Sequence, residues 1–319
     1  GKMLVKMVGG KKESYSKDFF DSVVKYNEVA VEAALQEEFD VIHCHDWMTF
    51  MAGVNLKQRT KKPLVVTVHS TESDRTGDNP NSWISHIEWT GTYNADKVIT
   101  VSAMMKDQLI TRYGVPKEKI EVIYNAVRHE DFTPGRIKSK LGDKIVLFLG
   151  RVTLQKGLDY LLEAAKLVVE KDKSVKFVIV GKGDQLHQMI ERAVHLGVIN
   201  NVFFIGYAPS IEEFYKMADV YVMPSVSEPF GIVALEAMAC GTPVIASKRS
   251  GVIEVAKHMM TVDFWDVKEL ANKILGVVTH PVVGYEMGKN GLEEVKNITW
   301  KKTAEQTMRV YERAIEVAR

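Results

Sequence analysis

Short β-branched apolar runs alternate along most of the chain with longer stretches whose apolar residues recur at helical spacing. This alternation is typical of parallel strands joined by crossover helices, and it predicts an α/β fold. Most of the runs end in Gly, Ser or Asn, and ligands of open parallel sheets bind beyond the carboxyl ends of the strands. We therefore expect the functional site at these ends. The candidate strands are residues 40–44, 63–70, 97–102, 120–125, 144–150, 176–183, 201–207, 219–225 and 243–247.

The alternation is interrupted at residues 129–142 (HEDFTPGRIKSKLG), where proline, glycine and charged residues replace the apolar runs. This composition is typical of a linker, and a chain of 319 residues is long enough for two α/β domains. We predict a first domain over residues 1–135, a second domain over residues 136–299 and a C-terminal helix over residues 300–319. The helix has no strand after it, so we expect it to pack across both domains.

The two ends of the chain lead to more specific expectations. The first domain is predicted to be short or truncated, because only residues 2–10 (KMLVKMVGG) could supply a strand before the helical pattern of residues 19–39. At the other end, four apolar residues recur at helical spacing and predict the buried face of the last helix. They are Ala304, Met308, Tyr311 and Ile315.

Charge and cysteine content exclude several classes of protein. The 42 Lys and Arg residues nearly balance the 41 Asp and Glu residues, so the chain has no basic field for a nucleic-acid partner. No apolar run approaches the roughly 18 residues that a membrane span needs, and the first residues lack the apolar core of a signal peptide. Cys44 and Cys240 lie far apart in apolar surroundings, which favours buried thiols in a reducing cytosol. We expect a cytoplasmic protein without a transmembrane segment.

The segment SEPFGIVALEAMACGTPVIAS (residues 227–247) carries the most informative pattern of the chain. A helix is predicted to begin near Ile232 and to end at the glycine and proline that follow it. Gly231 marks its start, where free backbone N–H groups and the helix dipole form a seat for a diphosphate. Glu228 precedes this seat and can accept hydrogen bonds from sugar hydroxyls, whereas Glu236 lies one turn inside and can hold the hydroxyls of a ribose.

Two carboxylates beside a diphosphate would repel it, so cations are needed nearby. The segment GRVTLQKG (residues 150–157) supplies Arg151 and Lys156 directly after a candidate strand. Arginine binds phosphate as a fork and lysine as a point charge, and both suit a pyrophosphate leaving group.

These residues resemble the retaining glycosyltransferases of the GT-B type, specifically family 4 and the related starch and glycogen synthases. The resemblance covers nearly all of residues 150–250 and, more patchily, residues 40–132. Its diagnostic feature is a pair of glutamates separated by seven residues, matched here by Glu228 and Glu236. It implies two Rossmann-like parallel-sheet domains that face each other across a cleft.

The resemblance also implies roles in binding the donor. Glu228 would contact the donor sugar, Glu236 the ribose, and Arg151 with Lys156 the diphosphate. The strand that ends in VGKGD is similar to the strand that precedes the base pocket in the family. The further donor-binding positions are Gly181, Gly183, Phe230, Gly231, Ile232 and Val233.

In the first half, the segment VIHCHDWMTFMAG (residues 41–53) is similar to the family's HDW segment. By the same resemblance, His69 at the end of VTVHS is the active-site histidine and Asp46 is near the acceptor. The chain departs from the family in two places. The family's glycine-rich first loop is absent, and residues 250–254 (SGVIE) replace two glycines and a proline before a glutamate.

The run HCHD leaves a second interpretation open, because His43 and His45 share one face of a strand and Asp46 follows. Two imidazoles and a carboxylate can bind zinc, although histidines satisfied by structural hydrogen bonds explain the same residues. No second cluster of ligands is present, and no Asp-X-Asp pattern follows a strand. We therefore expect no obligatory metal.

The implied reaction is transfer of a sugar from a nucleotide diphosphate to a hydroxyl group, with retention at the anomeric carbon. The HDW segment and residues 67–75 (TVHSTESDR) look more like glucan synthases, which implies glucose as the sugar and an α-1,4-glucan as the acceptor. The donor is then UDP-glucose or ADP-glucose, and the sequence does not distinguish them. A nucleotide-sugar epimerase of the same architecture and a non-catalytic nucleotide-sugar binder remain as alternatives.

Overall fold

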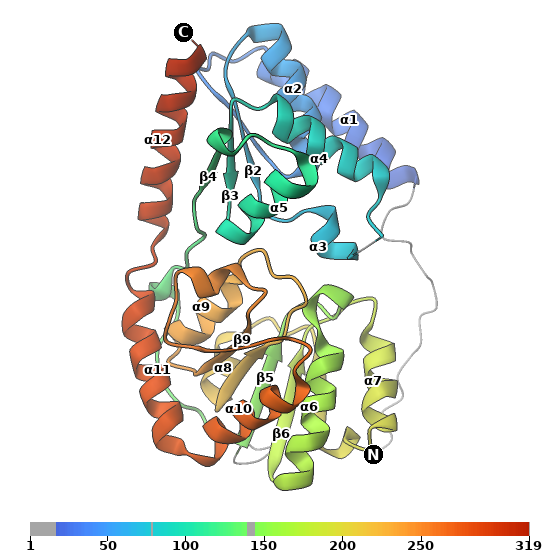
Figure 1. Ribbon diagram of the computed structural model, residues 1–319, viewed down its shortest axis with the longest axis vertical. Helices are drawn as coiled ribbons and strands as arrows, with labels where there is room; N and C mark the ends of the chain where they lie inside the picture. Colours follow the sequence, from blue (N-terminus) through green and yellow to red (C-terminus); the bar gives the residue numbers. More distant parts are fainter. Residues whose placement is uncertain (1–16, 78, 139–143, 319) are drawn as a thin grey trace.

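The computed structural model describes residues 17–77, 79–138 and 144–318. These residues form two α/β halves, each built on a parallel sheet, that lie one above the other in Figure 1. The predicted fold class is confirmed. Residues 2–10, which we expected to supply a first strand, lie outside the described residues, and the predicted domain limits stay a prediction.

The sheet of the first half has four parallel strands in the order β1-β2-β3-β4. Helices α2 and α4 pack together on one side of it, and α1 packs on α2. The strands are β1 (Ile42–His45), β2 (Leu64–Val68), β3 (Lys97–Thr100) and β4 (Ile120–Val122). The helices are α1 (Lys17–Ala34), α2 (Trp47–Thr60), α3 (Glu72–Thr76), α4 (Ser82–Asn94) and α5 (Ala103–Tyr113), and short 3-10 turns lie at η1 (Lys117–Lys119) and η2 (His129–Asp131).

The sheet of the second half has six parallel strands in the order β10-β9-β8-β5-β6-β7. They are β5 (Lys144–Leu149), β6 (Val175–Val180), β7 (Val202–Gly206), β8 (Val220–Met223), β9 (Val244–Ser247) and β10 (Met260–Val262). The helices that follow β5 in the chain are α6 (Leu158–Lys171), α7 (Leu186–His195), α8 (Glu212–Met217), α9 (Ile232–Ala239), α10 (Val267–Thr279), α11 (Pro281–Val295) and α12 (Trp300–Ala318), of which α12 belongs to the first half; 3-10 turns lie at η3 (Leu154–Lys156), η4 (Ile199–Asn201) and η5 (Gly251–Glu254).

The strand order of the second sheet locates its topological switch point. The chain runs outward from β5 through β6 to β7, and then resumes on the other side of β5 with β8, β9 and β10. The order therefore reverses between β5 and β8, and ligands of such sheets bind outside the carboxyl ends of the strands at this point. Residues 150–157 follow β5 and residues 224–231 follow β8, so both segments predicted to bind the donor start at the same edge.

The apolar runs form strands because both faces of each sheet are covered. In β5, Ile145 and Leu147 belong to one core cluster, whereas Val146 and Phe148 belong to another on the opposite face. A strand buried on both faces has no polar alternation, which explains its continuous apolar sequence. Every strand predicted from the sequence is present, although most are a few residues shorter. β10 was missed, because its three residues at the edge of the sheet are too few to show a pattern.

The last helix, α12, packs on the first half, after α11 has packed on α9 of the second half (Figure 1). Val310 and Ala314 of α12 join Val65, Ile99 and Ile123 in one core cluster. The chain thus returns to the first half just before α12, so its C-terminal part contacts both halves.

The predicted buried face of α12 was partly wrong. Ala304 and Met308 are exposed, and the face that packs carries Val310 and Ala314, which are fully buried. A helix that contacts one sheet buries a narrow stripe, and its other apolar residues then remain in solvent. Both cysteines are free and buried, as the sequence predicted. Among the described residues, no helix is long and apolar enough to cross a membrane.

Candidate functional site

Lys156 and Glu228, which come from different loops, form an ion pair at the switch point of the second sheet. The Nζ of Lys156 donates to Oε2 of Glu228 at 2.5 Å, and the Ser225 hydroxyl donates to the same oxygen at 3.2 Å. The exposed fractions of the two charged side chains are only 18% and 9%. The structure therefore brings together a predicted cation and a predicted glutamate that are separated by 72 residues.

The backbone that carries Glu228 is held by the loop after β9. The Glu228 N–H donates to the Arg249 carbonyl at 2.8 Å, and the Gly251 N–H donates back to the Glu228 carbonyl at 3.0 Å. A third bond runs from the Val252 N–H to the Phe230 carbonyl at 2.7 Å. These bonds fix the loop, so the position of the Glu228 carboxylate does not depend on its own side-chain contacts alone.

Helix α9 begins where the sequence predicted. Gly231 is its N-cap and has a φ of 103°, a conformation that favours glycine. A Cβ at this position would lie 2.8 Å from Cε of Met223 and 3.2 Å from Cγ of Glu228. Ile232 and Val233 form the half-buried first turn, whose N–H groups face away from the rest of the helix. The helix start thus lies in direct contact with the Glu228 side chain.

Glu236 lies on α9 and is held by Tyr215 of α8. The Tyr215 hydroxyl donates to Oε2 of Glu236 at 2.8 Å. Burial raises the pKa of Glu236, while the hydrogen bond from Tyr215 lowers it. Tyr215 is fully buried, so it fixes one of the two carboxylate oxygens of Glu236. No sequence signal pointed to Tyr215, because the two residues meet only when α8 and α9 pack on the same face of the sheet.

The predicted glycines bring the ends of β5 and β6 into backbone contact. A Cβ on Gly181 would lie 1.8 Å from the Gly150 carbonyl oxygen, and one on Gly183 would lie 2.0 Å from the Val152 carbonyl oxygen. No larger residue fits at either position without moving the backbone. Arg151, between these contacts, is exposed, and its guanidinium makes no hydrogen bond or ion pair within the residues that the structure describes. It is therefore free to meet a ligand.

His69 and Asp46, the predicted site residues of the first half, lie together at the carboxyl ends of β1 and β2. The Asp46 carboxylate accepts the His69 backbone N–H at 2.7 Å. Nε2 of His69 lies 2.9 Å from Nδ1 of His45, and the two rings stack with centroids 5.2 Å apart. Burial lowers the pKa of His45, and the neighbouring His69 lowers it further. Asp46 thus shapes the backbone that presents His69, a structural role that the sequence did not show.

His43 of the run HCHD is held by structural hydrogen bonds. Between residues 17 and 318, outside the short undescribed gaps, no group of three or more His, Cys, Asp or Glu residues could hold a metal ion. Nδ1 of His43 instead lies 2.6 Å from the Tyr311 hydroxyl of α12, and its Nε2 lies 2.7 Å from the Thr67 hydroxyl. Burial lowers the pKa of His43 to about 4, so the ring is neutral and serves as a structural hydrogen-bond partner.

The two halves meet through residues that sequence reasoning did not place in the site. The Ser227 hydroxyl donates to Oδ1 of Asp74 in α3 at 2.7 Å. The Glu254 carboxylate accepts the backbone N–H groups of Ala103 and Met104, at 2.7 and 3.1 Å, and so caps the start of α5. The segment SGVIE therefore forms a turn, η5, whose glutamate binds the opposite half.

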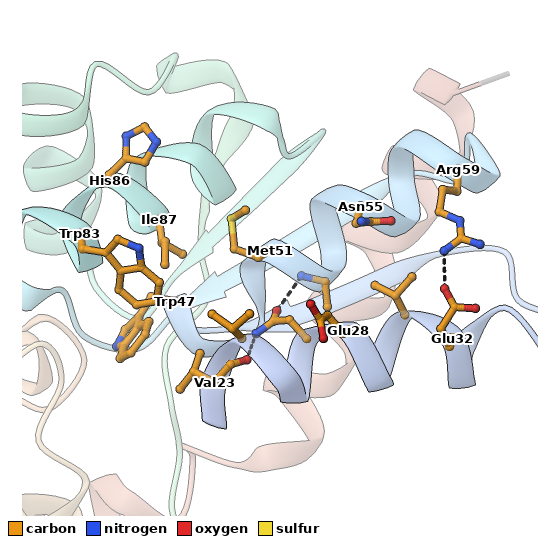
Figure 2. A pocket seen from close by; sticks show the side chains of 14 residues that line it. Val23, Glu28, Glu32, Trp47, Met51, Asn55, Arg59, Trp83, His86 and Ile87 are labelled. Atoms are coloured by element: carbon orange, nitrogen blue, oxygen red, sulfur yellow. Dashed lines mark hydrogen bonds and ion pairs between the residues drawn. The ribbon is translucent and has the colours of Figure 1, made fainter. Parts of the chain in front are cut away.

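A separate pocket of about 400 Å³ lies between α1, α2 and α4 of the first half. Figure 2 shows Trp47 and Trp83 at one end of this pocket and the ion pair of Arg59 with Glu32, 2.6 Å apart, at the other. None of the residues predicted to bind the donor or acceptor lines it.

Two α/β halves with parallel sheets, and a helix start beside a glutamate at the switch point of the second sheet, are the arrangement of the GT-B class of nucleotide-dependent transferases. Comparisons with known proteins then specify the family. Residues 18–131 match the family described as "Glycosyltransferase Family 4", and residues 130–294 match "Glycosyl transferases group 1". The chain belongs to this glycosyltransferase family, and its members are enzymes that use nucleotide-sugar donors.

The curated relatives have diverse names. An uncharacterized glycosyltransferase of Methanocaldococcus jannaschii is 35% identical over 302 residues, which cover 88% of this chain and 77% of the relative. The D-inositol 3-phosphate glycosyltransferase of Kribbella flavida is 31% identical over 307 residues, or 87% and 72% of the two chains. The glycogen synthase of Mycobacterium tuberculosis is 28% identical over 286 residues, or 85% and 68%.

Solved structures agree on the fold. The sucrose-phosphate synthase of Thermosynechococcus elongatus superposes with a TM-score of 0.80 at 24% identity, over 97% of this chain and 82% of that one. Anabaena HepE, in complex with UDP and glucose, superposes with a TM-score of 0.76 at 20% identity, over 90% and 80%. At this level of identity the likeness shows the GT-B fold alone.

Proposed function

We propose that this enzyme transfers glucose from UDP-glucose or ADP-glucose to a hydroxyl acceptor, with retention at the anomeric carbon. The observation that carries the proposal is the ion pair of Lys156 with Glu228 beside the start of α9, at the switch point of the second sheet. The family's use of nucleotide sugars supports the donor class, and the complex of HepE with UDP and glucose is a precedent for UDP and for the sugar.

Each charged group then has a distinct task in donor binding. A lysine ammonium has three N–H donors, so Lys156 can keep one on Glu228 and turn the others toward the diphosphate. Arg151 and the first N–H groups of α9 bind the same phosphates. Glu228, whose Oε2 is already engaged, offers Oε1 to a sugar hydroxyl. Glu236 offers its oxygen not bound by Tyr215 to the ribose.

Retention can proceed by two routes, and the contacts of the glutamates favour one of them. A double displacement needs a free carboxylate nucleophile, as in retaining glycosidases. Glu228 is paired with Lys156, and Glu236 accepts a hydrogen bond from Tyr215, so neither carboxylate is a free nucleophile. We favour a same-face route, in which the leaving phosphate takes the acceptor's proton as its own bond to the sugar breaks.

In this route the positive groups do the electrostatic work. Negative charge grows on the diphosphate as the glycosidic bond breaks, and Lys156, Arg151 and the helix dipole are already in place to stabilise it. Water competes with the acceptor for the sugar, so contact between the two halves must exclude it from the reacting atoms. In this arrangement His69 lies beside the sugar on the acceptor side and helps to exclude water there.

The acceptor that we propose is an α-1,4-glucan, supported by the relative named glycogen synthase and by the HDW and TVHSTESDR segments. D-inositol 3-phosphate is the second candidate, because relatives at similar identity carry that name. A polymer and a small phosphorylated polyol are so different in size and charge that one assay separates them.

The test is product analysis with radiolabelled UDP-glucose or ADP-glucose, incubated with glycogen, with D-inositol 3-phosphate or without acceptor. We expect label in the polymer, in the α configuration by NMR. Label in the inositol phosphate would show that D-inositol 3-phosphate, and not the glucan, is the acceptor, and the proposed transfer reaction would stand. A changed sugar on the nucleotide without any acceptor would identify an epimerase, and an unchanged donor under all conditions would leave only nucleotide-sugar binding.

A further inference from the structure

The short helix α3 lies on the side of the first half that faces the second half (Figure 1). It begins three residues after His69, and it packs on η3, the turn that carries Lys156. The same helix therefore adjoins the candidate residue of the acceptor side and a cation of the donor side.

Asp74 in α3 divides its carboxylate between the two halves. Its Oδ2 accepts the backbone N–H and the hydroxyl of Thr71, at 2.7 and 2.8 Å, and so closes a capping box at the start of α3. Gln108 of α5 donates to the same Thr71 hydroxyl at 2.9 Å. The other oxygen, Oδ1, accepts the Ser227 hydroxyl from the second half at 2.7 Å. With Asp74 only 6% exposed, water cannot readily replace a lost partner.

The bond to Ser227 completes a short path between the two candidate centres. His69 precedes the cap residue Thr71 by two positions, Thr71 binds Asp74, and Asp74 binds Ser227, which is bonded covalently to Glu228. Each link of this path is a direct bond to a buried or half-buried group. A shift of α3 relative to the second half is thereby transmitted to Glu228.

We propose that Asp74 and Ser227 are positioning residues that hold the acceptor-side histidine in register with the donor-binding glutamate. This inference rests on the proposed function and deepens it. In this proposal neither residue contacts the reacting atoms, and both act through Glu228 and α3. The Asp74–Ser227 bond determines how Glu228 and Lys156 face His69 across the boundary between the halves. Glu254, which caps α5, is a second contact between the halves. With that contact in place, the Ser227 bond restricts the remaining movement of α3 relative to the second half.

The bond matters to transfer more than to donor binding. The groups proposed for the nucleotide, on α9 and around Lys156, all belong to the second half and remain in place without Asp74. Transfer requires the acceptor, bound on the first half, to meet the sugar at a reactive distance, and errors of about 1 Å can cost on the order of 100-fold in rate. Loss of the bond should therefore lower kcat and leave nucleotide affinity unchanged.

The test is Ser227→Ala, which removes the hydroxyl and leaves the capping box of α3 intact. Ser227→Thr keeps a hydroxyl and serves as the conservative variant. The matched control is Ser174→Ala, because the Ser174 hydroxyl donates to Asp172 at 2.6 Å in a bond of the same kind within one half. For Ser227→Ala we expect kcat to fall about 5- to 50-fold, the Kd for UDP to stay within about twofold, and a larger share of donor to be hydrolysed. Ser227→Thr should recover most of kcat, and Ser174→Ala should match the wild type.

Two outcomes would overturn the inference while the wild type remains an active transferase. One is a kcat for Ser227→Ala within about twofold of the wild type; the other is a loss of UDP affinity in proportion to the loss of kcat, which would make Ser227 part of the donor site. Amide hydrogen exchange gives a readout independent of activity. We expect faster exchange in residues 72–76 of Ser227→Ala and not of Ser174→Ala. If the wild type transfers no sugar, the proposed function fails, and equal exchange in both variants would then also reject the structural link.

Discussion

Replacement of Lys156 by alanine tests the centre of the proposed site. The substitution removes the ammonium that pairs with Glu228 at 2.5 Å and leaves a carboxylate that is only 9% exposed. A pair at the surface contributes up to about 1 kcal/mol, whereas breaking a fully buried pair costs about 3–5 kcal/mol. The cost here should lie between these values, because the Ser225 hydroxyl still donates to the Glu228 carboxylate and because Lys156 is 18% exposed. We therefore expect Lys156→Ala to lower the free energy of unfolding by about 2 kcal/mol.

The effect on catalysis should be larger than the effect on binding. A donor that stabilises a developing oxyanion contributes about 10²–10³ in kcat. We expect kcat of Lys156→Ala to fall by that factor, while the Kd for UDP rises by less than about tenfold, because Arg151 and the start of α9 still hold the phosphates. The assay combines steady-state transfer kinetics with calorimetric titration of UDP and urea denaturation.

The matched control is Lys144→Ala. Lys144 forms an ion pair of the same length, 2.5 Å, with Asp172, and it lies at the opposite end of β5 from the proposed site. With side chains 30% and 21% exposed, this pair should contribute about 1 kcal/mol to stability and nothing to kcat. An unchanged kcat for Lys156→Ala, or equal losses of kcat in both variants, would refute the proposed role of Lys156.

Three further predictions follow from single contacts. Gly231→Ala adds a Cβ at a φ of 103° and 2.8 Å from Met223, so it should destabilise the protein by about 2 kcal/mol or more in urea denaturation. Its control, Gly276→Ala in the open interior of α10, should stabilise the protein by up to about 1 kcal/mol. Equal effects of the two substitutions would contradict backbone strain at Gly231. Tyr215→Phe should raise the pKa of Glu236 further and weaken UDP binding, measured by titration calorimetry, and unchanged affinity would argue against Glu236 as the ribose contact. Burial raises the pKa of Glu88 from 4.5 to about 7, so its stabilising contribution is present below pH 4.5 and is lost as the pH rises through 7. Relative to the wild type, Glu88→Gln should therefore gain about 2–3 kcal/mol of unfolding free energy between pH 5 and pH 8, and parallel pH profiles of the two proteins would exclude this effect.

Much of the fold could be predicted from local patterns. Apolar runs of strand length alternate with helical periodicity, so every strand but β10 was found, and the turn residues around α9 placed both ends of that helix. The segment with Glu228 and Glu236 pointed to the site for the same reason, because a helix start, a glycine and two carboxylates lie within ten residues of one another. These features depend on neighbours in the chain, and a sequence displays them directly.

Tertiary structure alone decided which side chains are partners. Lys156 meets Glu228 because β5 and β8 are neighbouring parallel strands whose following segments start at the same edge of the sheet. Tyr215 meets Glu236 because α8 and α9 pack together, and Ser227 meets Asp74 because the two halves are in contact. Packing also decided the role of His43 and corrected the predicted buried face of α12. The His43 ring lies within hydrogen-bond distance of a tyrosine hydroxyl of α12, 268 residues away. The face of α12 that is buried is the one that contacts the first sheet. Local sequence sets the conformations that each segment can adopt, whereas hydrogen-bond partners depend on packing between segments that no local pattern encodes.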